Sequence, residues 1–177
     1  MMETFSELIN RLNLTAENRL ELDEVPMVLM PLWFFVGIMK RIGAEVGSGR
    51  AAEIYYDAGY EGAYKWSKVQ IENGLKGPAV LEQYLNSMTN RGWGRFEILS
   101  LEEKDGRALF RLHHSAIALE QGLSEAPSCH WVPGAMAGSL QAILESKGNP
   151  LKVIGKEIGC LSAGQPYCEI IVEPATR

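Results

Sequence analysis

The sequence predicts an α+β protein in which helices pack on one antiparallel sheet of about four to five strands. Three observations predict this class. Helical periodicity fills the first half of the chain, a β-hairpin signal surrounds Lys104–Gly106, and one helix and two β-branched strands follow. Because the helices come early and the strands late, the order does not fit a regular β-α-β alternation. At 177 residues the chain is long enough to build a core without disulfides.

The first half of the chain contains three helical patterns and one extended stretch. Apolar residues recur at helical spacing from Glu3 to Leu12, which predicts a short amphipathic helix. An extended stretch over Val25–Met30 follows. The beginning of the next pattern, Leu32–Val46, is apolar nearly all round, so we expect that end to be buried. Arg50–Asn73 is the longest helical pattern.

The second half contains most of the predicted strands. The hairpin strands are apolar on alternate positions, so that Phe110 and His114 fall on the same face of the second strand. Pro133 stands in the first turn of the last helix, where its missing N–H costs nothing. The predicted elements are helix Ala79–Asn90, strands Phe96–Glu102 and Arg107–Ser115, a helical turn near Ile117–Leu123, helix Trp131–Lys147, and strands Leu151–Ile158 and Tyr167–Val172.

We divide the chain into residues 1–24, an amphipathic helix with its connection, and residues 25–177, a ligand-binding domain. The apolar face of the first helix and the segment Leu32–Phe35 offer more hydrophobic surface than the rest of the chain obviously covers. Exposed apolar surface of this kind marks interfaces. The sequence therefore predicts a homodimer whose contact includes residues 1–24; the apolar positions of the helix are Phe5, Leu8, Ile9 and Leu12.

Composition and charge argue against several classes of protein. The formal net charge is −5 and no Lys/Arg block occurs, so nucleic acid is not an expected partner. The acidic N-terminus does not resemble a signal peptide. The longest apolar run, Pro26–Met39, is shorter than the roughly 20 residues of a membrane span and is interrupted by Pro31. We expect a cytoplasmic protein with no membrane contact.

Two glycines stand inside the longest predicted helix, at Gly59 and Gly62. Each costs about 1 kcal/mol relative to alanine, so close packing or ligand access should compensate for it. Tight helix packing is one interpretation. The other, which we adopt as a prediction, is that both glycines border a ligand cavity against the hairpin Phe96–Ser115. Four more residues are candidates for its lining, with an ordinary packed core as the alternative: Trp66, Trp93, Phe110 and His114, the last as its polar group.

The chain has three cysteines, and all fall near other metal-ligating residues. Cys160 and Cys168 follow Glu157 closely, and Cys129 lies upstream beside His130. A strand, a glycine-containing loop and a returning strand can bring Glu157 and the last two thiols together, and zinc takes four such ligands. Three unrelated buried cysteines explain the pattern equally well. A catalytic Cys129–His130 pair is disfavoured because adjacent side chains seldom face each other.

The C-terminal half resembles the 4-vinyl reductase domain. The resemblance is carried by Cys129–Gly138, Lys156–Cys160 and Gly164–Pro174, and most specifically by the cysteine and glutamate pattern. Upstream, Tyr56–Ala63 resembles the small-residue helix of that family, and Gly92–Glu97 resembles the start of one of its strands. The similarity extends over nearly the whole chain.

The resemblance implies the NO-signalling/Golgi-transport ligand-binding fold. Phenol-responsive sensor domains, an accessory protein of bacteriochlorophyll synthesis and subunits of the TRAPP tethering complex share that fold. It also implies a zinc ion bound by Cys129, Glu157, Cys160 and Cys168, with His130 as the substitute for Cys129. The aromatic residues that contact phenol in the sensors have no match near Pro133 or Gly155.

The function implied by the resemblance is binding or sensing of a small hydrophobic or aromatic molecule by a zinc-stabilised domain without catalysis. A protein partner would then carry the readout. Two alternatives remain open at this point. One is an accessory protein or reductase-like enzyme of tetrapyrrole synthesis, although the dinucleotide motif Gly-x-Gly-x-x-Gly is absent. The other is a subunit of a protein assembly.

Overall fold

The structure is a computed structural model that describes residues 4–23 and 25–175. Its helices and strands follow the predicted order, with shifts of a few residues at their ends. In chain order they are α1 (Phe5–Arg11), β1 (Leu12–Leu14), β2 (Leu20–Leu22), β3 (Val25–Met27), α2 (Leu32–Val46), α3 (Ser48–Glu72), α4 (Pro78–Asn90), β4 (Arg95–Glu102), β5 (Arg107–His113), α5 (Ala116–Gln121), α6 (Trp131–Ser146), β6 (Val153–Gly159) and β7 (Cys168–Pro174). Short 3₁₀ turns, η1 (Glu103–Asp105) and η2 (Leu161–Ala163), join β4 to β5 and β6 to β7.

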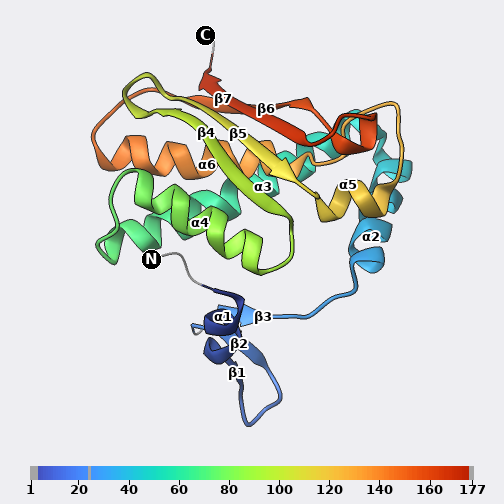
Figure 1. Ribbon diagram of the computed structural model, residues 1–177, viewed down its shortest axis with the longest axis horizontal. Helices are drawn as coiled ribbons and strands as arrows, with labels where there is room; N and C mark the ends of the chain where they lie inside the picture. The colour runs from blue at the N-terminus through green and yellow to red at the C-terminus, as the bar shows by residue number, and fades with distance from the viewer. Residues whose placement is uncertain (1–3, 24, 176–177) are drawn as a thin grey trace.

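A four-stranded antiparallel sheet of order β4-β5-β7-β6 covers the helices (Figure 1). Its inner face is apolar because alternate side chains of β5 point the same way, and Ala108, Phe110 and Leu112 are all buried. The α+β prediction is confirmed, and the main sheet has the expected number of strands. The second sheet, β1-β2-β3, was not predicted as a sheet: β3 falls within the predicted extended stretch Val25–Met30, whereas β1 and β2 are too short to show a period of two.

Helix α6 lies at the centre of the fold. Every residue from Val132 to Leu144 is buried, because the sheet covers one side of the helix and α3 covers another. The sequence explains this, since no charged residue occurs between Trp131 and Leu144, and a helix apolar all round is a core helix.

Among the described residues, no helix combines the length and hydrophobicity that crossing a membrane requires.

Glycines allow the backbones of α3 and α6 to touch. A Cβ atom added to Gly59 would lie 2.1 Å from the carbonyl oxygen of Trp131, and one added to Gly134 would lie 2.1 Å from that of Tyr56. Gly59 therefore packs against α6 and does not border a cavity against the hairpin, so that prediction is wrong. Gly62 is exposed, and a Cβ atom added there would have nothing within 4 Å. The tight-packing interpretation holds for Gly59.

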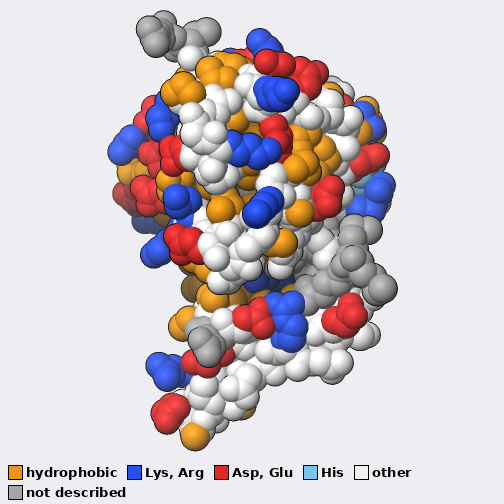
Figure 2. All heavy atoms as spheres, turned by 90° about the vertical axis from the view of Figure 1, so that its left-hand side faces the viewer, with side chains coloured by type: hydrophobic (Ala, Val, Ile, Leu, Met, Phe, Trp, Pro, Cys, Tyr) orange, Lys and Arg blue, Asp and Glu red, His pale blue; other side chains and the backbone are white. Residues whose placement is uncertain are grey.

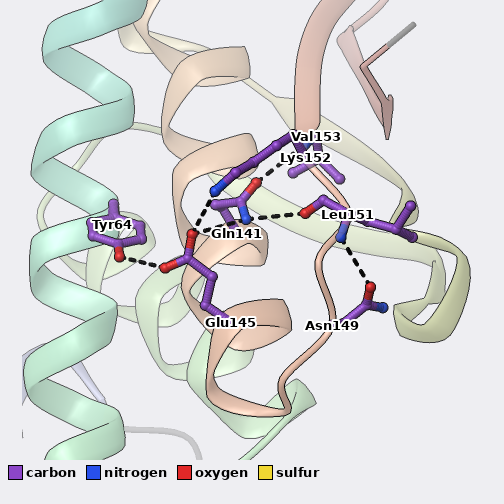
Figure 3. A network of polar contacts seen from close by, with 7 residues as sticks. All are labelled: Tyr64, Gln141, Glu145, Asn149, Leu151, Lys152 and Val153. Atoms are coloured by element: carbon purple, nitrogen blue, oxygen red, sulfur yellow. Dashed lines mark hydrogen bonds and ion pairs between the residues drawn. The ribbon is translucent and has the colours of Figure 1, made fainter. Parts of the chain in front are cut away.

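A polar network fixes the beginning of β6, which is an edge strand (Figure 3). The buried Gln141 side chain donates to the Leu151 carbonyl at 3.1 Å and accepts from the Val153 N–H at 3.1 Å. One turn later, Glu145 accepts hydrogen bonds from the Tyr64 hydroxyl at 2.6 Å and from Lys152 at 2.9 Å. The network ties α3 and α6 to the segment that leads into β6, in addition to the pairing of β6 with β7.

Replacing Gln141 with leucine should destabilise the fold by about 2–4 kcal/mol, because the backbone groups of Leu151 and Val153 lose their buried partners. The control is Glu145→Gln. It keeps the shape of the side chain at a partly exposed position and should cost about 1 kcal/mol or less. Urea unfolding followed by circular dichroism measures both. Equal, small losses would show that the Gln141 hydrogen bonds do not hold the strand.

Residues 4–23 and 25–27 form a small N-terminal module that lies below the body of the protein and is joined to it by the extended segment Val28–Pro31 (Figure 1). Thr4 caps α1, and its hydroxyl accepts from the Glu7 N–H at 3.3 Å. The module buries Leu8 and Leu22 between its own elements, which pack chiefly on each other. Figure 2 shows this module beneath a body whose charges of both signs are interspersed.

Candidate metal centre

The four residues of the predicted metal site come from three segments that meet at one end of the sheet. Cys129 lies just before His130, the N-cap residue of α6, and Glu157 lies on β6. Cys160 follows β6, and Cys168 begins β7 after the short η2 turn. Their ligand atoms all lie within 4.8 Å of one another, so these side chains can hold a metal ion. The antiparallel return of β7 beside β6 explains why the two closely spaced cysteines meet.

The sulfur atoms lie at distances that suit a metal better than a disulfide. The Sγ atom of Cys168 is 3.7 Å from that of Cys129 and 3.7 Å from that of Cys160. A disulfide needs about 2.05 Å, and the three thiols are free and buried. One carboxylate oxygen of Glu157, Oε2, accepts from the Cys129 N–H at 3.1 Å, whereas the buried Oε1 has no partner in the described part of the chain. Oε1 is therefore available as a ligand atom.

Polar groups around the cluster point toward its sulfur atoms. The Leu161 N–H donates to the Cys168 sulfur at 3.4 Å. The Ser115 hydroxyl lies 3.1 Å from the sulfur of Cys129, and the Ser162 hydroxyl lies 3.2 Å from that of Cys160. Both serines are buried, so these contacts replace the hydrogen bonds that their hydroxyls would otherwise make to water. Such donors stabilise the negative charge of metal-bound thiolates. Sequence reasoning missed both serines.

Burial and mutual contact control the ionisation of the cluster. Burial raises the pKa of Glu157 to about 9, and the contact with Cys160 adds to the effect. Hydrogen bonds from Cys129 and Cys168 lower the pKa of the Cys160 thiol, and contacts with Cys160 and Cys168 raise the pKa of Cys129. Without a cation, burial and these contacts favour the thiolate at Cys160 and the protonated forms of Cys129 and Glu157. A cation reverses this balance, because metal binding displaces the protons of its ligands.

His130 stands beside the centre but does not join it. The cluster contains Cys129 and not His130, so the structure places the cysteine, rather than its expected substitute, among the other candidate ligands. His130 occupies the N-cap position of α6, and burial lowers the pKa of its imidazole.

The predicted aromatic site residues pack in or against the hydrophobic core. Phe110 is fully buried in the core beneath the sheet. The ring centroid of Trp93 is 4.9 Å from that of Trp131, and the centroid of Trp66 is 5.2 Å from that of Tyr84. All these contacts are those of packed core aromatics. A ligand-binding role for Trp66, Trp93 and Phe110 stays a prediction.

His114 does not point into the core as its place in the strand pattern predicted. Strand β5 ends at His113, and His114 adopts a left-handed conformation with φ 54°. Its side chain is exposed. The expectation that His114 is the polar group of an internal pocket is therefore wrong, because the alternation of faces stops one residue earlier than expected.

Gly155 on β6 packs directly against Pro133 in the first turn of α6. A Cβ atom added to Gly155 would lie 2.0 Å from the Pro133 carbonyl oxygen. β6 and the first turn of α6 are thus in backbone contact at this point.

Three solved structures share this fold at low sequence identity. The phenol-responsive sensory domain of the transcription activator PoxR, solved with phenol, matches with a TM-score of 0.77 and 21% identity, over 96% of this chain and 88% of that one. A vinyl-4-reductase family protein from Methanocaldococcus jannaschii matches with a TM-score of 0.57 and 18% identity, over 85% of each chain. Subunit 3 of a trafficking protein particle complex from Naegleria fowleri, covalently bound to palmitic acid, matches with a TM-score of 0.55 and 11% identity, over 82% of this chain and 95% of that one.

The fold and the cluster together define an α+β protein of the architecture shared by these three structures, with a candidate metal centre at one end of its sheet. The resemblance to the 4-vinyl reductase domain is supported at the level of the fold. Residues 11–99 match the model of the family described as "Domain of unknown function (DUF5943)", and the chain belongs to this family. No curated protein matches the sequence.

Proposed function

We propose that the chain is a zinc-stabilised domain that binds a small hydrophobic or aromatic molecule without catalysing a reaction. The observation that carries the proposal is the cluster of Cys129, Glu157, Cys160 and Cys168. The fold of the phenol-responsive domain supports a ligand-binding role, since PoxR uses the same architecture to respond to phenol.

Zinc suits the donor set better than other common metals. Sulfur atoms bound at about 2.3 Å on the corners of a tetrahedron lie about 3.8 Å apart, and two sulfur pairs here lie 3.7 Å apart. Thiolates favour zinc over magnesium or calcium, which prefer oxygen ligands. Three thiolates and one carboxylate carry two negative charges beyond those that Zn²⁺ neutralises, which accounts for the donors from Ser115, Leu161 and Ser162.

The structural role of the metal follows from the number of ligands. A catalytic zinc keeps a position open for water or substrate, whereas four protein ligands complete the tetrahedron. The ion would then hold the start of α6 against the β6–β7 turn. It would contribute to folding because binding free energy and folding free energy are linked.

Native mass spectrometry of the freshly purified, unchelated protein tests the proposal. The expected result is one zinc ion per chain and a bound molecule that leaves on mild denaturation. Absence of zinc would contradict the metal assignment. A tetrapyrrole mass would favour the role in tetrapyrrole synthesis, and zinc without any small molecule would favour a subunit of a protein assembly.

We also propose that the chain forms a homodimer through residues 1–24 and the apolar segment Leu32–Phe35 at the start of α2, and that residues 25–177 form the ligand-binding domain, with β3 (Val25–Met27) pairing back onto β2 of the N-terminal module. Trp33 is 65% exposed, and Val28 and Leu29, in the connection, are 76% and 85% exposed. A module as small as residues 4–27 buries little apolar surface by itself. A second copy of the same surface would cover these side chains.

Replacing Trp33 with glutamate should therefore convert a dimer into a monomer, because a charge would be buried at the centre of the apolar face. The matched control is Val69→Glu, an exposed apolar position on α3 far along the chain from this surface. Light scattering coupled to size-exclusion chromatography measures both variants at micromolar concentration. A wild-type monomer would overturn the proposed dimer, as would a dimer that is unchanged by Trp33→Glu.

A further inference from the structure

A cleft of about 220 Å³ opens between α2, the first turns of α3 and the loop that leads to the metal centre. Its walls are largely apolar. They comprise Met39 and Gly43 from α2, Ala51 from α3, and Ala126 and Pro127 from the loop. None of the ligand-binding residues predicted from the sequence lines this cleft. It is also separate from the closed contact between Gly155 and Pro133.

The walls of the cleft are held in place without a ligand. The Tyr55 ring lines it, and its hydroxyl is already used, since it donates to the Met39 carbonyl at 2.7 Å. The loop is tied to η2 by the Ser124 N–H, which donates to the Ser162 carbonyl at 2.8 Å. At its end the loop runs into Cys129 of the metal cluster. Preformed concave sites with apolar walls and few polar groups are typical of small-molecule binding.

The charge around the cleft favours an anion. None of the described residues that line it is acidic, and Lys40 contributes a positive charge at the exposed rim. Ser48, the first residue of the long helix α3, also lines the cleft. The C-terminus of α2 and the N-terminus of α3 meet at Gly47, so the opposite partial charges of the two helix ends offset each other and Lys40 carries the charge of the cleft.

We infer that this cleft is the ligand site of the chain and that its ligand is a small carboxylate with an apolar ring. The ring lies among Met39, Gly43 and Ala126, and the carboxylate faces Lys40. A dry cavity of about 150 Å³ holds benzene, so this space accepts one ring or two fused rings. The inference rests on the proposed function, because it names the place and the charge of the ligand proposed there.

Fluorescence titration with 2-naphthoate tests the inference, with the uncharged isostere 2-naphthamide as the matched ligand. We expect saturable binding of one 2-naphthoate per chain, about tenfold tighter than that of the amide. Lys40→Gln should reduce the affinity for 2-naphthoate to that for the amide, and Lys65→Gln, on an exposed part of α3, should leave it unchanged.

A second pair of variants tests the location. Ala126→Trp places a bulky side chain in the cleft and should abolish binding of both probes. Leu123→Trp, in the same loop but outside the cleft and 87% exposed, should not. Failure of 2-naphthoate to bind, or equal binding by Ala126→Trp, would overturn the inference. If an apolar molecule is then still found by native mass spectrometry, the proposed function stands and the ligand lies elsewhere; if none is found, both fail.

Discussion

Replacing Cys168 with serine should release the metal and lower the free energy of unfolding by at least about 4 kcal/mol. The Sγ atom of Cys168 lies 3.7 Å from the sulfur atoms of both Cys129 and Cys160. Its loss therefore removes the ligand that is next to both of the other thiolates. Structural zinc sites in small peptides contribute about 10–16 kcal/mol of apparent binding energy. Part of the stability should be retained here because α6 and the sheet provide a core of their own.

Chelation provides the internal control for this prediction. A strong chelator should lower the stability of the wild-type protein to that of Cys168→Ser and leave the variant unchanged. Ser162→Ala, which removes one hydroxyl contact to Cys160 and no ligand, should keep the metal and lose about 1 kcal/mol. If chelator and variant both leave the unfolding transition where it was, the cluster is a group of buried thiols and not a metal centre.

Alanine substitutions at Gly59 and Gly62 should change stability in opposite directions. At Gly59 the new methyl group would lie 2.1 Å from the carbonyl oxygen of Trp131. This oxygen is a backbone atom and cannot move away by a change of rotamer. Helices α3 and α6 would have to separate, which should cost about 3 kcal/mol or more. At Gly62 the methyl group meets nothing within 4 Å, so the higher helix propensity of alanine should add about 0.5–1 kcal/mol.

Thermal unfolding of the two variants side by side measures this difference. Both variants carry the same substitution in the same helix, so the gain in helix propensity is the same in each. The difference in stability between them therefore measures the cost of the contact between residue 59 and α6. A Gly59→Ala protein as stable as Gly62→Ala would mean that the two helices are not in backbone contact. Metal content should stay at the wild-type level in Gly62→Ala, because Gly62 is not among the ligands and its substitution displaces no neighbour.

The helices and the main sheet could be predicted because their signals are local. The periodicity of Leu32–Val46 gave the bounds of α2, and the hairpin at Lys104–Gly106 gave β4 and β5 to within a few residues. In the N-terminal module only β3 falls in a predicted extended stretch, Val25–Met30; β1 and β2 have no such signal. The prediction for His114 was wrong for a related reason. The sequence pattern continues the alternation of faces through this residue, but His114 adopts a left-handed conformation that ends the alternation after β5.

The candidate site was predictable only in part. Three cysteines and one glutamate at a family-like spacing pointed to one place, and the structure brings them together. The supporting serines carried no signal, because Ser115 reaches Cys129 through tertiary packing alone. The contact of α3 with α6 did have a sequence signal, which is the small-residue spacing of Gly134 and Gly138. Sequence reasoning overlooked it. The cleft depends on how α2, α3 and a loop meet, which no local pattern encodes.

The central claim is that Cys129, Glu157, Cys160 and Cys168 hold one zinc ion. X-ray absorption at the zinc edge of the freshly purified, unchelated protein tests it most directly. We expect a four-coordinate ion with three sulfur atoms at about 2.3 Å and one oxygen atom at about 2.0–2.2 Å. A sample without zinc, or a first shell with no sulfur, would contradict it.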